Sequence, residues 1–259
     1  MASPVKAKKH LGQHFLIDLN IAQKIVNALP QDELITIEIG PGTGVLTQYM
    51  IDKDNFIAFD IDIESIEFLK EKYPQYKDKI QFQDFLEADL TAFASKGNFK
   101  VIGNFPYNIS TQIMFKVLEH RESVSSLVGM FQKEVAQRIA EKPGSKTYGI
   151  LSVLLQAFYK IEYLFTVSEH VFNPPPKVKS AVIRLTRNTT DKLNCNEDLF
   201  FKVVKASFNQ RRKTVRNSVK VLSGNSEVES IYLDKRAEQL SVAEFVELTN
   251  SIEIALNKK

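Results

Sequence analysis

The sequence predicts an α/β fold with a mostly parallel sheet, followed by a small, all-helical domain. Three observations support this prediction. Strand-like and helix-like segments alternate through the first two-thirds of the 259 residues, as they do when helices cover both faces of a sheet. A glycine-rich turn joins the first strand to the first helix. After Arg187 the strand signals end, and only helical periodicity continues.

The strand candidates are short apolar runs, and the helix candidates carry apolar residues at helical spacing. In chain order, strands are expected at 34–39, 55–59, 80–82, 99–103, 124–131, 159–167 and 181–185. The helices between them are expected at 46–51, 64–73, 113–118, 134–140 and 149–157. Together these elements define a first domain that comprises residues 1–187.

The second domain is expected to comprise residues 188–259, after a polar linker at 188–191. Its helices are expected at 199–208, 214–222 and 242–256. The net charge of the chain is only +3, but basic residues gather in this domain. Residues 199–226 contain no acid and seven cations: Lys202, Lys205, Arg211, Arg212, Lys213, Arg216 and Lys220. This cluster favours contact with a nucleic acid, although a merely solvated helix face is the alternative.

Several classes of protein are excluded by composition. Cys195 is the only cysteine, so an intramolecular disulfide is impossible and a thiolate metal cluster is implausible. The four histidines show no metal-ligand spacing, and we expect no metal site. No stretch approaches the ~18 apolar residues of a membrane span, and the N-terminus lacks the apolar core of a signal peptide. We therefore expect a cytoplasmic protein without a membrane partner.

A glycine loop at 38–44, with the pattern E-x-G-x-G-x-G, follows the first strand. Gly40 and Gly42 allow the backbone to approach a ligand closely and to adopt positive φ. A dinucleotide-binding loop would read G-x-G-x-x-G, but position 45 is Val, and no G-K-[ST] follows to bind phosphate. The pattern is instead typical of S-adenosylmethionine binding, because that cofactor has no phosphate.

Two acidic residues end the next two strands. Asp60 follows the second strand, where a carboxylate can accept hydrogen bonds from ribose hydroxyls. Asp84 follows the third strand and can accept from the adenine amino group of the cofactor. Single aspartates are also common as helix caps and in turns, but their succession on neighbouring strand ends favours a cofactor site.

The quartet Asn104-Phe105-Pro106-Tyr107 ends the fourth strand. It resembles [N/D/S]-P-P-[Y/F], a pattern of methyltransferases that act on exocyclic amines of nucleobases, with Phe105 in the variable second place. The Asn104 oxygen can accept from an amino N–H, Pro106 fixes the backbone, and the Tyr107 ring can stack on a base. We predict these three as the catalytic residues. An ordinary strand-to-loop turn is the alternative.

Six ordered segments extend this interpretation to a family. They are KHLGQHFL at 9–16, NFPYNIS at 104–110, QKEV at 132–135, SKTYG at 145–149, FNPPPKV at 172–178 and FNQRRKT at 208–214. Together they resemble the ribosomal RNA adenine dimethyltransferases, the KsgA family. The resemblance implies a Rossmann-like methyltransferase domain and a helical RNA-binding domain. It also implies the activity: S-adenosylmethionine would methylate two adjacent adenosines in the 3′-terminal hairpin of 16S rRNA, giving N6,N6-dimethyladenosine at each.

The same resemblance implies roles for individual residues. A segment at 1–30 would cover the cofactor, which would contact His14, Leu16, Gly40, Gly42, Asp60, Asp84 and Asn104. Phe172 would close on the target base, and Lys202, Arg211, Arg212 and Lys213 would bind RNA. Two residues depart from the usual pattern: His14 stands where many relatives have Asn, and Asp60 replaces the more common Glu. The departure at 14 leaves the role of its side chain open.

The expected partner is 16S rRNA within a 30S pre-subunit, and we expect a monomer. Two other functions stay open. One is a methyltransferase of the antibiotic-resistance type, which acts on an adenosine of 23S rRNA. The other is a non-catalytic nucleic-acid-binding factor with the same fold, which the intact glycine loop and quartet disfavour.

Overall fold

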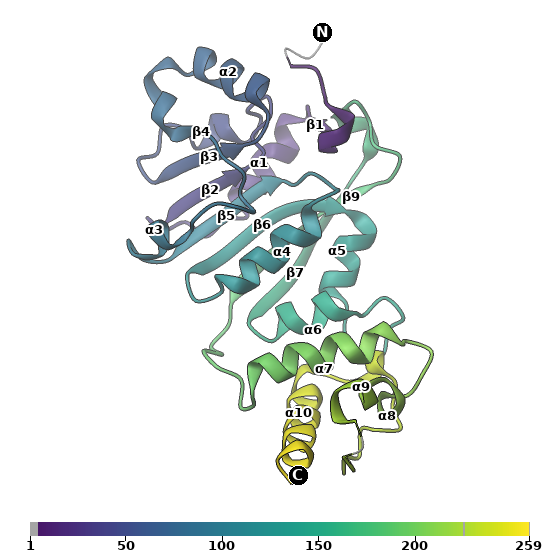
Figure 1. The fold of residues 1–259 in the computed structure, drawn as a ribbon. Coiled ribbons are helices and arrows are strands. Elements are labelled where there is room, and N and C mark those ends of the chain that lie inside the picture. Colours follow the sequence, from purple (N-terminus) through teal and green to yellow (C-terminus); the bar gives the residue numbers. More distant parts are fainter. Residues whose placement is uncertain (1–4, 225, 259) are drawn as a thin grey trace. The chain divides into compact units, whose positions relative to one another are not determined.

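The computed structural model describes residues 5–224 and 226–258, and Figure 1 shows its fold. The chain forms two compact units. The first contains the chain up to Ala136 together with Ile161–Arg187, and the second contains Gln137–Lys160 together with the chain from Asn188 onward. The sequence predicted a single boundary after residue 187. That prediction assigns residues 137–160 to the first domain, whereas the structure groups them with the second unit.

A seven-stranded sheet has the order β4-β3-β2-β5-β6-β9-β7. The strands are β2 (Ile35–Ile39), β3 (Phe56–Asp60), β4 (Ile80–Phe82), β5 (Phe99–Asn104), β6 (Val124–Gln132), β7 (Tyr159–Val167) and β9 (Ser180–Arg187). The pairs from β4 to β6 are parallel, and β9 is antiparallel to β6. The carboxyl ends of β2, β3 and β5 therefore meet at one edge, where ligands of open α/β sheets bind.

The helices of the first unit are α1 (Leu19–Asn27), α2 (Ile63–Lys72), α3 (Thr91–Ala94), α4 (Ser110–Glu119) and the beginning of α5 (Lys133–Ala140). In Figure 1, α4 lies in front of the sheet and α1 behind it. The Asp18 carboxylate begins α1 by accepting from the N–H groups of Asn20 and Ile21. Asp62 begins α2 in the same way. The apolar faces of α1 and α2 pack on the sheet and belong to one buried core.

A second, two-stranded sheet joins the N-terminal segment to a distant loop. The strands β1 (Phe15–Leu16) and β8 (Phe172–Asn173) are antiparallel, with Phe15 opposite Asn173 and Leu16 opposite Phe172. Both Leu16 and Phe172 are buried in the core. This pairing holds the N-terminal segment beside the large sheet.

The second unit is helical apart from the start of β7. Besides the end of α5, its helices are α6 (Ile150–Gln156), α7 (Glu197–Asn209), α8 (Val215–Ser218), α9 (Lys220–Ser223) and α10 (Val242–Asn257). Phe200, Phe208 and Phe245 are buried among them and form an aromatic core. No helix within the described residues is long and apolar enough to span a membrane.

Two predicted helices differ from the structure. The segment expected as a helix at 46–51 contains only a 3₁₀ turn, Thr47–Tyr49, because the N–H groups of Tyr49 and Met50 bond to carbonyls three residues back. The helix expected at 214–222 is broken into α8 and α9. The Ser218 hydroxyl there donates to the carbonyls of Thr214 and Val215, which is a back-bonding arrangement that bends helices.

Candidate active site

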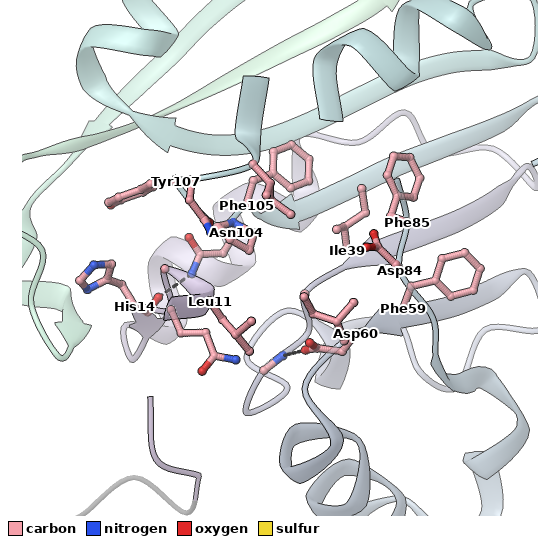
Figure 2. Close-up of a pocket in the computed structure, with 18 of the residues that line it drawn as sticks. Leu11, His14, Ile39, Phe59, Asp60, Asp84, Phe85, Asn104, Phe105 and Tyr107 are labelled. Carbon is pink, nitrogen blue, oxygen red and sulfur yellow. Dashed lines mark hydrogen bonds between the residues drawn. The ribbon is translucent and has the colours of Figure 1, made fainter. Parts of the chain in front are cut away.

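A pocket of about 770 Å³, counted out to its mouth, lies at the carboxyl edge of the large sheet. Figure 2 shows Phe59, Phe85 and Asp84 on one side of it, and His14 and Tyr107 on the other. Its lining comprises residues 11–15, Ile39, Gly40, Gly42, 59–61, 83–85 and 104–109. All of these belong to the first unit. The pocket thus brings together the glycine loop, both predicted acids and the quartet.

The glycine loop approaches the pocket with backbone alone. Gly40 and Gly42 have φ values of 65° and 54°, in the left-handed region that favours glycine. A Cβ on Gly42 would lie 2.8 Å from the Phe15 ring. The Phe15 ring therefore fills the space in which a side chain at 42 would stand, and Gly42 contributes only backbone to the lining of the pocket.

Asp60 is buried at the end of β3 and held by the backbone. Its Oδ2 accepts from the Gly42 N–H at 3.2 Å, and its Oδ1 accepts from the Asp62 N–H at 2.9 Å. Burial raises the pKa of Asp60 to about 6, although these two N–H donors lower it. Each oxygen keeps a lone pair, so the ionised carboxylate suits a pair of hydroxyl donors such as those of a ribose.

Asp84 follows β4 and lies beside apolar side chains (Figure 2). Its Oδ1 accepts from the Leu86 N–H at 2.8 Å, which fixes the carboxylate at the rim of the pocket. The side chains of Ile39, Phe59 and Phe85 lie near it in Figure 2. This combination of an acceptor and apolar walls suits an adenine ring with an amino group. The acid was predicted from the sequence, but the three apolar residues were not, and their only signal is that they lie at or near strand ends.

The pocket carries no charge that would bind a phosphate. Among the described residues that line it there is neither lysine nor arginine. Acidic and apolar groups instead face a glycine loop. The lining therefore fits S-adenosylmethionine, which carries no phosphate, better than a nucleotide cofactor.

A buried carboxyl group lies directly beneath the glycine loop. Glu38, on β2, is 1 % exposed and accepts from the Thr47 hydroxyl at 2.8 Å. Burial raises the pKa of Glu38 to about 8, so the group is mostly protonated at neutral pH. It lines a small cavity that the glycine loop shares with Asn104. No role was predicted for this residue, although it begins the glycine motif.

The amide of Asn104 has a defined orientation. Its Nδ2 donates to the His14 carbonyl at 2.8 Å, so Oδ1 is the acceptor that the side chain can offer to a ligand. Figure 2 shows this bond beside the pocket. The sequence predicted an acceptor at this position. The hydrogen bond gives the reason why the oxygen, and not the nitrogen, serves as the ligand-facing group.

The Phe105 side chain points away from the pocket into the core. It is 1 % exposed and makes an edge contact with Phe131 at 5.1 Å between ring centroids. Gly103 and Gly129 provide its space, because a Cβ on either would lie 2.6 Å or 2.2 Å from the ring. Only the backbone of Phe105 can therefore contact a ligand. The carbonyl of the next residue, Pro106, accepts from the Ile109 N–H at 3.2 Å.

Tyr107 lies at the other end of the quartet, beside His14. The two ring centroids are 5.4 Å apart with an interplanar angle of 31°. The Tyr107 hydroxyl shares a hydrogen bond of 2.5 Å with the Ser180 hydroxyl. Burial raises the pKa of Tyr107, so the phenol stays neutral and can act as a surface for stacking but not as a base.

The N-terminal segment is anchored across the mouth of the pocket. Lys8 forms an ion pair with Asp62, and the Gln13 amide donates to the same carboxylate at 2.9 Å. Hydrogen bonds and the Lys8 charge lower the pKa of Asp62 although burial raises it. Asp62 therefore ties the covering segment to the helix that follows Asp60. No role was predicted for Asp62 from the sequence, where its only signal is its position two residues after Asp60.

A second cavity, of about 960 Å³, adjoins the pocket. Gly12, Gln13, His14 and Tyr107 line both, and the second is completed by Ala7, Lys9, Gln132 and residues 174–178. Phe172 was predicted to face the target base, but it is 3 % exposed and packs in the core. The prolines that follow it line the second cavity instead. Leu16, predicted to contact the cofactor, is also buried, beside the glycine loop.

The predicted RNA-binding residues lie in the second unit. Lys202, Arg211, Arg212 and Lys213 are all exposed. The Arg211 side chain is nevertheless hydrogen-bonded within the protein. Its Nη2 donates to the carbonyls of Lys146 and Tyr148 at 2.6 Å and 3.0 Å. Its guanidinium also lies over the Phe208 ring, at 5.9 Å from the centroid. Arg211 therefore supports a neighbouring loop, whereas no such contact is recorded for Arg212 and Lys213 among the described residues.

Comparison with known proteins supports a single family. The family model described as ribosomal RNA adenine dimethylase matches residues 5–253. The chain is 60 % identical over 253 residues to Ribosomal RNA small subunit methyltransferase A of Cytophaga hutchinsonii, covering 96 % of this chain and 98 % of the relative. It is 56 % identical over 256 residues to the protein of that name from Bacteroides thetaiotaomicron, covering 97 % and 96 %.

Solved structures agree with this result. A dimethyladenosine transferase from Plasmodium falciparum superimposes with a TM-score of 0.78 at 26 % identity, covering 93 % of this chain and 98 % of that one. The 23S rRNA methyltransferase ErmE superimposes with a TM-score of 0.65 at 24 % identity, covering 91 % and 99 %, and shows the shared fold. The pocket, the quartet and these matches agree, and the chain belongs to the ribosomal RNA adenine dimethylase family.

Proposed function

We propose that the protein transfers methyl groups from S-adenosylmethionine to N6 of two adjacent adenosines in the 3′-terminal hairpin of 16S rRNA. Each becomes N6,N6-dimethyladenosine, and the reaction takes place in the cytoplasm, on a 30S pre-subunit. The observation that carries this proposal is the orientation of the Asn104 amide: Nδ2 is bound to the carbonyl of His14, a residue that lines both cavities, and Oδ1 is left as the acceptor on the wall of the first cavity.

The pocket at the sheet edge is the proposed cofactor site. Gly40 and Gly42 would lie against the methionine part, Asp60 would accept from the ribose, and Asp84 would accept from the adenine amino group. The bound cofactor supplies a sulfonium methyl group as the electrophile. The backbone of residues 12–15 would cover it from the N-terminal side.

The second cavity is the proposed entrance for the target adenine. The lone pair of N6 is delocalised into the ring, so the free base is a weak nucleophile. Asn104 Oδ1 and the Phe105 carbonyl would accept from the amino group and favour a tetrahedral nitrogen that is aligned with the methyl group. The Pro106 carbonyl is a poorer candidate, because it already accepts from Ile109. Tyr107 would stack on the base, which must leave its own stack to enter.

The exposed cations of the second unit are the proposed contacts with the RNA backbone. Lys202, Arg212 and Lys213 would each neutralise phosphate charge and give an affinity that depends on salt but not on sequence. The proposal includes a monomer, since the lining of the pocket and the quartet need no residue from a second copy.

A methylation assay on three substrates tests this function. We expect transfer of radiolabelled methyl groups to 30S particles that lack the modification, and only weak transfer to naked 16S rRNA or to 50S particles. Nuclease digestion and mass spectrometry should then identify N6,N6-dimethyladenosine. Preferred methylation of 50S particles would assign the 23S-specific function instead, and no transfer to any substrate would favour the non-catalytic factor.

The role of Asn104 is tested by Asn104→Ala. This variant should lose methyl transfer by at least ~100-fold, because the acceptor that aligns the amino group is absent, while it binds S-adenosylmethionine within a few-fold of wild type. Calorimetric titration with the cofactor provides the control. Near-normal turnover of the variant would refute the mechanism.

A further inference from the structure

His14 makes three contacts that connect the catalytic amide with the proline-rich loop. Its carbonyl accepts from Asn104 Nδ2 at 2.8 Å, and its Nδ1 lies 2.8 Å from the Pro174 carbonyl. Its ring lies 5.4 Å from that of Tyr107. His14 also lines both cavities, so all three contacts lie on the wall between them.

The register of the small sheet explains why the His14 carbonyl is available to Asn104. The Ile17 N–H donates to the Val171 carbonyl at 2.9 Å, so residues 17 and 171 form a hydrogen-bonded pair. Bonded and non-bonded pairs alternate along an antiparallel ladder, so Phe15 and Asn173 are the next bonded pair and His14 lies just beyond it. The His14 carbonyl therefore points away from β8, and the Asn104 amide donates to it.

The side chain of His14 adds a bond beyond the last pair of the ladder. The Pro174 carbonyl can only accept, so Nδ1 carries the proton and the imidazole is fixed in one tautomer when it is neutral. This bond ties residue 14 to the proline-rich loop at the point where the ladder has stopped. It therefore holds the backbone, and with it the carbonyl that Asn104 uses.

The orientation of the Asn104 amide depends on that carbonyl. If the carbonyl moved away, the amide could rotate by half a turn and present Nδ2 to the target amino group. Two donors would then face each other, and the alignment of the nucleophile would be lost. We propose that His14 is a positioning residue: its Nδ1–H, bound to Pro174, fixes the carbonyl that keeps Asn104 Oδ1 directed at the substrate. This inference rests on the proposed function.

Two substitutions separate the hydrogen bond from the ring. His14→Asn keeps a donor, because the amide Nδ2 can occupy nearly the same place as the imidazole Nδ1, but it removes the ring next to Tyr107. His14→Phe keeps a ring and removes the donor. Loss of one such bond should lower kcat of His14→Phe by about 3- to 10-fold. His14→Asn should recover to within about twofold of wild type.

The measurements are kcat and KM for S-adenosylmethionine on 30S particles, calorimetric affinity for S-adenosylhomocysteine, and the thermal midpoint of each variant. A positioning role predicts that His14→Phe lowers kcat while cofactor affinity and thermal midpoint stay close to wild type. Equal losses in cofactor affinity and stability would show a packing role and overturn the proposal. An unchanged kcat in His14→Phe, or an equal loss in His14→Asn, would overturn it as well.

A spectroscopic measurement does not depend on activity. Nitrogen NMR of the histidine-labelled wild-type protein should show His14 with the proton on Nδ1, and His14→Phe identifies its signal by difference. The opposite tautomer would refute the bond to Pro174 even if the enzyme is active. A protein that has the expected tautomer but methylates no adenosine would refute the proposed function and leave the hydrogen bond in place.

Discussion

The buried carboxyl group of Glu38 gives the clearest prediction about stability. Glu38→Gln is nearly isosteric and preserves an oxygen that can accept from Thr47, but it cannot ionise. Burial raises the pKa of Glu38 from its ordinary 4.5 to about 8 in the folded protein. One pKa unit corresponds to ~1.4 kcal/mol, so keeping Glu38 ionised in the fold costs about 5 kcal/mol.

The sign of the pH effect follows from which state holds the proton. Above pH 4.5 the unfolded chain has released the Glu38 proton, whereas the folded protein keeps it up to about pH 8. The free energy of unfolding of the wild type should therefore fall by ~1.4 kcal/mol for each pH unit between 5 and 8, as far as Glu38 contributes. Glu38→Gln lacks this contribution. Its free energy of unfolding should therefore exceed that of the wild type by a margin that grows to about 4 kcal/mol as the pH rises from 5 to 8.

Urea unfolding of both proteins at several pH values between 5 and 9 measures the difference. Circular dichroism is the suitable signal, because the chain contains no tryptophan. Other titrating groups, including Asp60, are present in both proteins, and their contributions largely cancel in the comparison. A difference in the free energy of unfolding that does not change with pH would refute the reasoning. It would mean that Glu38 is ionised in the fold.

Two further predictions concern the glycine loop and the basic surface. Gly42→Ala should lose about 1–3 kcal/mol of stability and at least ~10-fold in cofactor affinity, since an alanine at φ 54° is strained and its Cβ meets Phe15. Gly97→Ala is the matched control: its φ is also positive but nothing lies within 4 Å, so calorimetry should show unchanged cofactor affinity. In filter binding of a 16S rRNA fragment, Arg212→Gln and Lys213→Gln should each reduce the salt dependence of log K by about 1. Arg211→Gln should weaken binding with a smaller change in slope, because Arg211 is bound to two carbonyls; an equal change would show that it contacts phosphate.

Most of the large sheet could be predicted from the sequence because its strands are apolar runs separated by helical patterns. The helix α1 was missed although its signal is present: Asp18 is a capping residue, and Ala22, Ile25 and Val26 lie on one buried face. The small sheet had no such signal. Two-residue strands show no periodicity, and Phe15 and Asn173 are far apart in the chain.

The candidate site was predictable where a single residue type determines the chemistry. The glycine loop, Asp60, Asp84 and Asn104 all line one cavity, as their strand ends indicated. Phe172 was placed wrongly, because an aromatic residue beside a proline-rich loop can face either the cavity or the core, and its pairing with Leu16 directs it to the core. The orientation of the Asn104 amide could not be predicted, since it depends on a carbonyl from a distant segment.

The packing of Phe105 has a consequence for how the quartet can be varied. Its ring occupies space that exists because two neighbouring strands carry glycine, at 103 and 129. The three positions therefore constitute one steric unit with a fixed total volume. A randomised library at 103, 105 and 129 would return coupled solutions at 105 and 129, in which a larger residue at 129 requires a smaller one at 105, whereas 103 would stay glycine because a Cβ there would also lie 2.6 Å from the Ile39 carbonyl oxygen. If position 105 alone were randomised, almost all folded variants should retain phenylalanine there.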